Sequence, residues 1–91
     1  LLSVEETQKY FDSDDARMCI PTDYALENGV DRYTVYPTGD KSTCLWWLRS
    51  PGAYPNYAAV IGFDGDASGV GNFCQGVNGV RPAIWIDLSG F

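Results

Sequence analysis

The side chains best suited to chemistry lie between two tryptophan-rich blocks, Trp46–Gly52 and Gly79–Leu88. The intervening residues 53–78 are rich in Tyr, Asn, Ser and Gly. Such residues are favoured in adaptable binding loops, because Tyr gives a large contact area at low entropic cost and Asn and Ser give flexible hydrogen bonding. The segment therefore predicts a ligand-binding surface, with an ordinary hairpin as the alternative.

Catalytic chemistry has little support in the sequence. The chain contains no His, the commonest general base. No Ser or Cys has an evident activating partner, and the carboxylates of Asp14 and Asp15 fall in a polar stretch where solvation explains them. The glycines between Gly69 and Gly79 belong to hairpins rather than to the start of a helix, where phosphates bind. We therefore predict no enzyme activity and no cofactor.

Metal binding is also not predicted. The segment Asp64–Gly69 matches the start of an EF-hand loop, but Gln75 stands where the bidentate Glu is needed. The three cysteines, Cys19, Cys44 and Cys74, form no CxxC pair. Buried free thiols are the default expectation, and a Cys44–Cys74 disulfide stays open.

Composition indicates one folded domain of 91 residues, with 45% hydrophobic, 14% aromatic and 20% charged residues. The net charge is −6, with nine acidic and four basic residues in 1–44 and three and two in 45–91. An acidic chain without a basic cluster excludes nucleic acid and anionic membrane surfaces as partners. No apolar run approaches the length of a membrane span, so direct membrane insertion is not expected.

The first half predicts helices and the second half strands. Ser3 and Glu6 form a capping box for a helix ending near Asp12, and Leu1-Leu2 could close a strand before it. An acidic turn follows at 12–15, then a helix over Asp23–Asn28 capped by Thr22, and a strand-poor loop over 30–43.

Short β-type runs begin at Cys44. Strands are predicted at Leu45–Arg49, at Ala58–Phe63 and Ala67–Val70 around an Asp64-Gly65 hairpin turn, and at Val80–Leu88, an apolar run expected to be buried on both faces. Trp46 and Trp47 should point to opposite faces. Arg49 should bond a carbonyl or a carboxylate, and Arg81 should pair internally. The fold class is α+β: two short helices, then a small antiparallel sheet with long loops.

A family resemblance is carried by three blocks taken together: Leu1–Glu6, Trp46–Gly52 and Gly79–Leu88. They resemble a bacterial family of unknown function that is common in gut bacteria and has the C-type-lectin-like fold. Formylglycine-generating enzymes and the variable proteins of diversity-generating retroelements share this fold. The resemblance implies that residues 1–91 form one C-type-lectin-like domain, or the C-terminal part of a larger one. It also implies a variable, ligand-binding region at 46–85 whose candidate contact residues are Tyr54, Asn56, Tyr57, Phe63, Asp66, Asn72, Phe73 and Gln75.

The expected function is therefore non-enzymatic recognition of a protein or glycan by a domain of a cell-surface or secreted protein. Motifs of calcium-dependent lectins are not found, so sugar binding through calcium is not implied. One alternative is a relic or member of the formylglycine-generating enzyme type, which requires two cysteines close together in a cleft, or a bound metal. Another is a purely structural module of a surface protein.

Overall fold

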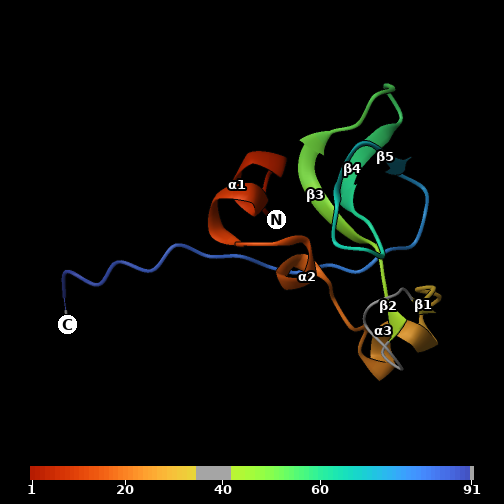
Figure 1. Ribbon diagram of the computed structural model, residues 1–91, viewed down its shortest axis with the longest axis horizontal. Coiled ribbons are helices and arrows are strands. Elements are labelled where there is room, and N and C mark those ends of the chain that lie inside the picture. The colour runs from red at the N-terminus through yellow and green to blue at the C-terminus, as the bar shows by residue number, and fades with distance from the viewer. Residues whose placement is uncertain (35–41, 91) are drawn as a thin grey trace.

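The computed structural model describes residues 1–34 and 42–90, in which short helices precede small antiparallel sheets (Figure 1). The α+β class is thus confirmed. The helices are α1 (Val4–Tyr10), α2 (Asp14–Arg17) and α3 (Asp23–Glu27). The strands are β1 (Tyr33–Thr34), β2 (Ser42–Thr43), β3 (Trp46–Pro51), β4 (Tyr57–Ile61) and β5 (Ala67–Phe73).

The two predicted helices begin at the predicted caps. The hydroxyl of Ser3 accepts a hydrogen bond from the Glu6 amide at 3.1 Å, and Glu6 Oε1 accepts one from the Ser3 amide at 2.8 Å. This reciprocal capping box satisfies two amides that the first turn leaves unpaired. Thr22 caps α3 through the Ala25 amide at 3.1 Å. Helix α1 ends at Tyr10, two residues before the predicted Asp12.

The predicted acidic turn at residues 12–15 is wrong, because helix α2 begins inside it. The Ser13 hydroxyl accepts a hydrogen bond from the Ala16 amide at 3.2 Å, and Asp14 and Asp15 occupy the first turn. Acidic residues near a helix N-terminus and Arg17 in its last turn both suit the helix dipole. The described residues therefore contain three helices rather than two.

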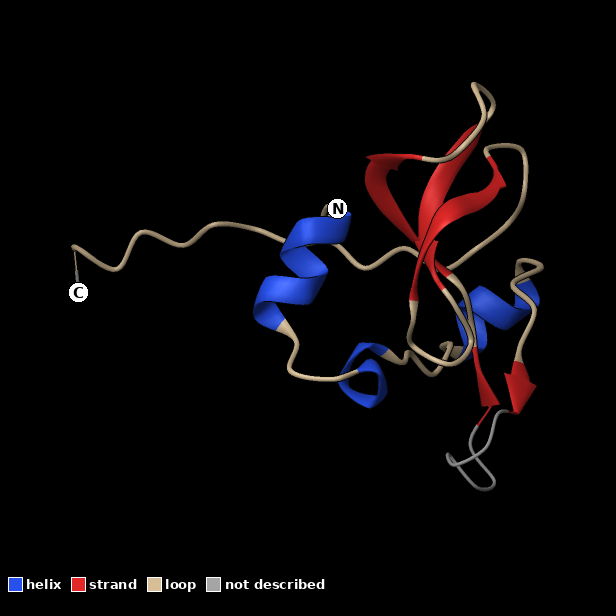
Figure 2. Cartoon of the chain, turned by 45° about the horizontal axis from the view of Figure 1, so that its top comes forward, coloured by secondary structure: helices blue, strands red, loops and turns tan. Residues whose placement is uncertain are grey.

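The larger sheet has the order β3-β4-β5, with both pairs antiparallel (Figure 2). The predicted hairpin turn lies between β4 and β5, and Gly65 has φ +84° there. Helix α2 packs on this turn, since the Arg17 Nε donates to the Gly65 carbonyl at 3.1 Å. The register shifts further along the hairpin, where Gly71 has φ +80° and approaches the Ala58 carbonyl. A side chain at Gly71 would collide with that carbonyl.

Two further segments differ from expectation. The stretch predicted as a loop over 30–43 contains the β1–β2 pair at its ends, whereas residues 35–41 lie outside the described part of the chain. Leu1 and Leu2 form no strand. Leu2 nevertheless extends the hydrogen bonding of β3, because its carbonyl accepts from the Arg49 amide at 2.9 Å.

The core lies between helix α1 and one face of the β3–β4 pair. Trp46, Leu48, Ala59 and Ile61 are buried together, with partly buried Leu2, Val4, Phe11, Cys19 and Ala67 against them. Trp46 is 1% exposed, whereas Trp47 lies partly exposed on the opposite face, as period-2 alternation predicted. The Trp46 indole Nε1 also donates to the Arg17 carbonyl at 2.9 Å, which ties β3 to α2.

The prediction of a buried strand at Val80–Leu88 is wrong. Ile84 is 80% exposed and Trp85 83% exposed, and the C-terminal segment (residues 80–90) runs away from the body as an extended chain (Figures 1 and 2). Pairing with β3 occurs only at Gly79, through a parallel bridge to Trp46. An apolar run is buried on both faces only when other layers cover it, and the described residues place no strand beside this segment.

Candidate functional site

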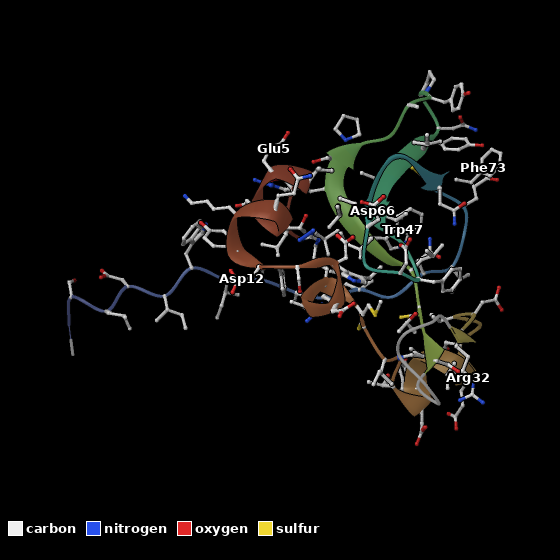
Figure 3. The ribbon with its side chains drawn as sticks, viewed as in Figure 1. Glu5, Asp12, Arg32, Trp47, Asp66 and Phe73 are labelled. Atoms are coloured by element: carbon white, nitrogen blue, oxygen red, sulfur yellow. The ribbon has the colours of Figure 1, made fainter. Side chains whose placement is uncertain are left out.

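Three aromatic side chains predicted to contact ligand lie together at one end of the larger sheet. Tyr57 on β4 pairs directly with Phe73 on β5, and their ring centroids are 4.5 Å apart. The Tyr54 ring meets that of Tyr57 edge-on at 5.0 Å. Tyr54 is 58% exposed and Phe73 49% exposed. We call Tyr54, Tyr57 and Phe73 the aromatic cluster; Figure 3 shows Phe73 on the side of the molecule away from α1.

Backbone hydrogen bonds fix the loop that carries the aromatic cluster. The Tyr57 amide donates to the Tyr54 carbonyl at 3.0 Å, which closes a tight turn. The Ala53 amide donates to the Val70 carbonyl at 3.0 Å, and the Cys74 amide to the Asn56 carbonyl at 2.9 Å. The loop is therefore joined to β5 on both sides of the turn. Rings held in this way lose little freedom on binding a ligand.

Three residues with amide side chains lie next to the aromatic cluster along the chain. Asn56 occupies the tight turn, and the Asn72 Oδ1 accepts from the Phe73 amide at 2.9 Å. Gln75 is exposed in a second turn, which the Gly76 amide closes on the Phe73 carbonyl at 2.8 Å. Each such side chain carries both donors and an acceptor and has no formal charge. The arrangement can thus present apolar ring surface beside neutral hydrogen-bonding groups.

Phe63 and Asp66 lie away from the other six predicted contact residues. Both belong to the β4–β5 turn, at the opposite end of the hairpin from Tyr57 and Phe73. The Phe63 carbonyl accepts from Thr43 Oγ1 at 2.6 Å, and the Asp66 amide donates to Asp64 Oδ1 at 3.0 Å. The eight residues therefore divide into a group of six and a separate pair, although none of the eight is buried.

A shallow apolar hollow of about 150 Å³ lies over the β3–β4 pair. It is lined by Leu1, Trp47, Leu48, Ala58 and Cys74. Ala58 and Cys74 directly follow two cluster residues in the chain. Trp47 is not among the contact residues predicted from the sequence. Its alternation with buried Trp46 was the signal that places it on the other face, next to this hollow.

A second, larger groove of about 400 Å³ lies between α1 and the C-terminal segment, and sequence reasoning did not predict it. Its walls are mostly apolar, but Arg49 Nη1 and Glu6 Oε1 form an ion pair of 2.8 Å there. The predicted bond from Arg49 to a carboxylate is thereby confirmed. The Ser3 backbone amide, with smaller contributions from the Ser3 hydroxyl and Arg49, holds the pKa of Glu6 below its ordinary value. Trp85 meets Tyr10 edge-on at 6.4 Å across this groove.

The cysteines are free in the structure, so the Cys44–Cys74 disulfide left open by the sequence is not formed. Cys44 is buried and its amide donates to the Cys19 carbonyl at 2.9 Å, whereas Cys74 is exposed. Burial raises the pKa of the Cys44 thiol to about 11, and the neighbouring Cys19 adds to the rise. Within residues 1–34 and 42–90, no three His, Cys, Asp or Glu side chains gather into a potential metal site.

Arg81 makes its contacts with rings rather than with a carboxylate. Its guanidinium carbon lies 4.6 Å from the centre of the Trp46 ring and 5.6 Å from that of Phe11. Such cation–π contacts favour a positive charge over an aromatic face. The Nη1 atom is buried without a hydrogen-bond partner. The internal pairing predicted for Arg81 is therefore replaced by stacking on the core.

Comparison with protein families gives one assignment. Residues 1–88 match the model of a family described as "Domain of unknown function (DUF6273)", so the chain belongs to that family. Neither a curated protein nor a solved structure matches the chain. In the part of the chain that the structure describes, no helix has the length and apolar character needed to cross a membrane.

Proposed function

We propose that this member of the DUF6273 family is a non-enzymatic recognition module that binds its ligand at the aromatic cluster. The observation that carries the proposal is the packing of Tyr54, Tyr57 and Phe73 into one partly exposed surface on a hydrogen-bonded loop. A contiguous patch of exposed apolar rings is unfavourable in water and is typical of a surface that a partner covers. A binding role accounts for their exposure.

The chemistry of the surface favours a neutral ligand face, on either a protein or a glycan. Aromatic rings supply contact area, and the amides of Asn56, Asn72 and Gln75 supply orientation through hydrogen bonds. None of these six residues carries a formal charge, so binding should depend only weakly on ionic strength. Asp66 and Phe63 would contact the ligand only if it reached the far end of the hairpin.

We further propose that the domain has the C-type-lectin-like fold, belongs to a cell-surface or secreted protein, and is diversified over residues 46–85. Support comes from the placement of the eight candidate positions outside the buried core, where substitutions disturb packing least. Gene neighbourhood tests this part. A reverse transcriptase beside a near-copy of the coding region for 46–85 that differs at adenines would support diversification, and a neighbourhood without both would contradict it.

Binding itself is tested by titrating the isotope-labelled chain with two panels of probes, neutral disaccharides and short uncharged peptides. The expected result is shifts of the Tyr54, Tyr57 and Phe73 resonances with one panel. Tyr54→Ala and Phe73→Ala should each weaken that binding about tenfold or more, as truncation of a central aromatic contact does. Tyr24→Ala is the matched control, since Tyr24 is an exposed tyrosine on α3. Equal loss in the control, or no shift with either panel, would contradict the proposal.

The enzymatic alternative has one observation in its favour, the proximity of Cys19 and Cys44. A catalytic cysteine needs a thiolate near neutral pH and access to substrate. Cys44 has neither property, because its pKa is raised to about 11 and its side chain is buried. Thiol titration and metal analysis of the purified protein distinguish the binding proposal from the enzymatic alternative. Only the enzymatic alternative predicts bound metal or rapid alkylation of both Cys19 and Cys44.

A further inference from the structure

Two cysteines from separate parts of the chain meet beside the core. Cys19 lies between α2 and α3, and Cys44 lies between β2 and β3. Their backbones are joined by the hydrogen bond from the Cys44 amide to the Cys19 carbonyl, of 2.9 Å. The side chain of Cys19 also lies within hydrogen-bonding reach of the Cys44 thiol. Thiols this close can form a disulfide without a large movement of the backbone.

Cys74 is placed too far away to compete. Cys44 precedes Trp46, which pairs with Ile61 at one end of β4. Cys74 follows Phe73, which pairs with Tyr57 at the other end of the same strand. The length of β4 therefore separates Cys74 from Cys44.

The two neighbouring thiols differ in reactivity. Cys19 is partly exposed and can meet a reagent from solvent, whereas Cys44 is buried against Gly79, whose added Cβ would lie 3.2 Å from the Cys44 Sγ. Burial and the adjacent Cys19 raise the pKa of Cys44, and the positive charge of Arg81 lowers it. The guanidinium of Arg81 stacks on Trp46 next to Cys44 in the core, with its Nη1 unpartnered. It is the group positioned to stabilise a thiolate that forms there.

We propose that Cys19 and Cys44 are a redox modification site that closes to an intrachain disulfide when a small-molecule disulfide, such as oxidised glutathione, is present. The Cys19 thiolate attacks one sulfur of the small disulfide, whose S–S bond breaks and releases one small thiol. Cys44 then gives up its proton and attacks the Cys19 sulfur, which releases the second small thiol. Both protein thiols are oxidised and the small disulfide is reduced to two thiols, so atoms and electrons balance.

The order of attack follows from burial. Cys19 is accessible, and Cys44 reacts only with a sulfur that Cys19 has already brought to it. The disulfide would join the two ends of residues 19–44, the segment that carries α3 and the β1–β2 pair. A cross-link over a segment of this length restricts the unfolded chain. We expect the unfolding temperature to rise by roughly 5 °C or more.

The test treats the full chain with oxidised glutathione at low protein concentration and measures intact mass, peptide linkage and free thiols. In the wild type, the linked peptide pair containing Cys19 and Cys44 should be two hydrogen atoms lighter than the two reduced peptides, and the exposed Cys74 should be free or carry one glutathione. Cys74→Ser is the matched control and should close the same bond. Its unfolding temperature should rise on oxidation as that of the wild type does.

Two variants keep the test decisive if one fails to fold. Cys19→Ser removes the partly exposed member and should abolish the loss of two hydrogens while leaving Cys44 unmodified. Cys44→Ala removes the buried member and should stop at a stable mixed disulfide between Cys19 and glutathione. The proposal is overturned if the wild type keeps three free thiols, if the linked peptides contain Cys74, or if Cys19→Ser still closes a bond. Failure here would leave the proposed binding surface untouched, because none of its residues takes part.

Discussion

Gly65→Ala should strongly destabilise the domain, because Gly65 lies in the hairpin turn on which α2 packs. Gly65 has φ +84°, which costs an L-residue about 1–2 kcal/mol. The added Cβ would also collide with the Asp14 carbonyl oxygen, so helix α2 must move off the hairpin. Overpacking of this kind costs about 1–3 kcal/mol. The expected loss in the free energy of unfolding is therefore about 2–5 kcal/mol.

Urea unfolding followed by tryptophan fluorescence measures this loss, with thermal unfolding as a second readout. In a domain of this size, 1 kcal/mol corresponds to about 4–8 °C, so the unfolding temperature should fall by roughly 10 °C or more. Gly90→Ala is the control, because an added Cβ there meets no atom within 4 Å. A Gly65→Ala protein within about 0.5 kcal/mol of wild type, or an equal loss in the control, would refute the docking of α2 on the hairpin turn.

Three further changes probe other parts of the structure. Because the pKa of Glu6 is lowered in the folded state, its ionised carboxylate stabilises the fold above the ordinary carboxyl pKa of about 4.3, and this stabilisation is lost as the pH falls through the folded pKa. The urea midpoint of the wild type should therefore fall more between about pH 6 and pH 3 than that of Glu6→Gln. Parallel curves for the two proteins would exclude this contribution. Trp46→Phe leaves the Arg17 carbonyl without its indole donor and should lower the free energy of unfolding in urea by about 2 kcal/mol. An unchanged free energy would show that this hydrogen bond does not stabilise the fold. Ile84→Asp should cost less than about 0.5 kcal/mol because Ile84 is 80% exposed, and a loss of several times that amount would show that the segment packs.

Local sequence signals predicted the local features well. The capping box of Ser3 and Glu6, the cap at Thr22 and the turn at Asp64-Gly65 all depend on residues a few positions apart, and each is confirmed. The alternation of Trp46 and Trp47 is equally local. The missed helix α2 came from treating the acidic residues after Ser13 as a solvated turn, although the same residues suit the first turn of a helix.

The errors of longer range share a different cause. A buried strand was predicted for the C-terminal segment because Ile84, Trp85 and Ile86 are consecutive apolar residues. Burial depends on neighbours that sequence does not specify. The backbone pairs with β3 only at Gly79, just before the segment, and within the segment Arg81 stacks on Trp46. The contact residues were likewise predicted as one set, although strand direction separates Phe63 and Asp66 from the aromatic cluster.

The sequence by itself determined the α+β class, the helix caps, the hairpin turn and the placement of Trp46 and Trp47 on opposite faces. These follow from periodicity and from hydrogen bonds between near neighbours. Only the tertiary structure decided that Tyr54 joins Tyr57 and Phe73, that Glu6 meets Arg49, and that Cys19 meets Cys44. These contacts join positions brought together by strand register and by the packing of helices on the sheet. Register is set by the whole ladder rather than by any one residue, so the spacing of these residues along the chain could not reveal them.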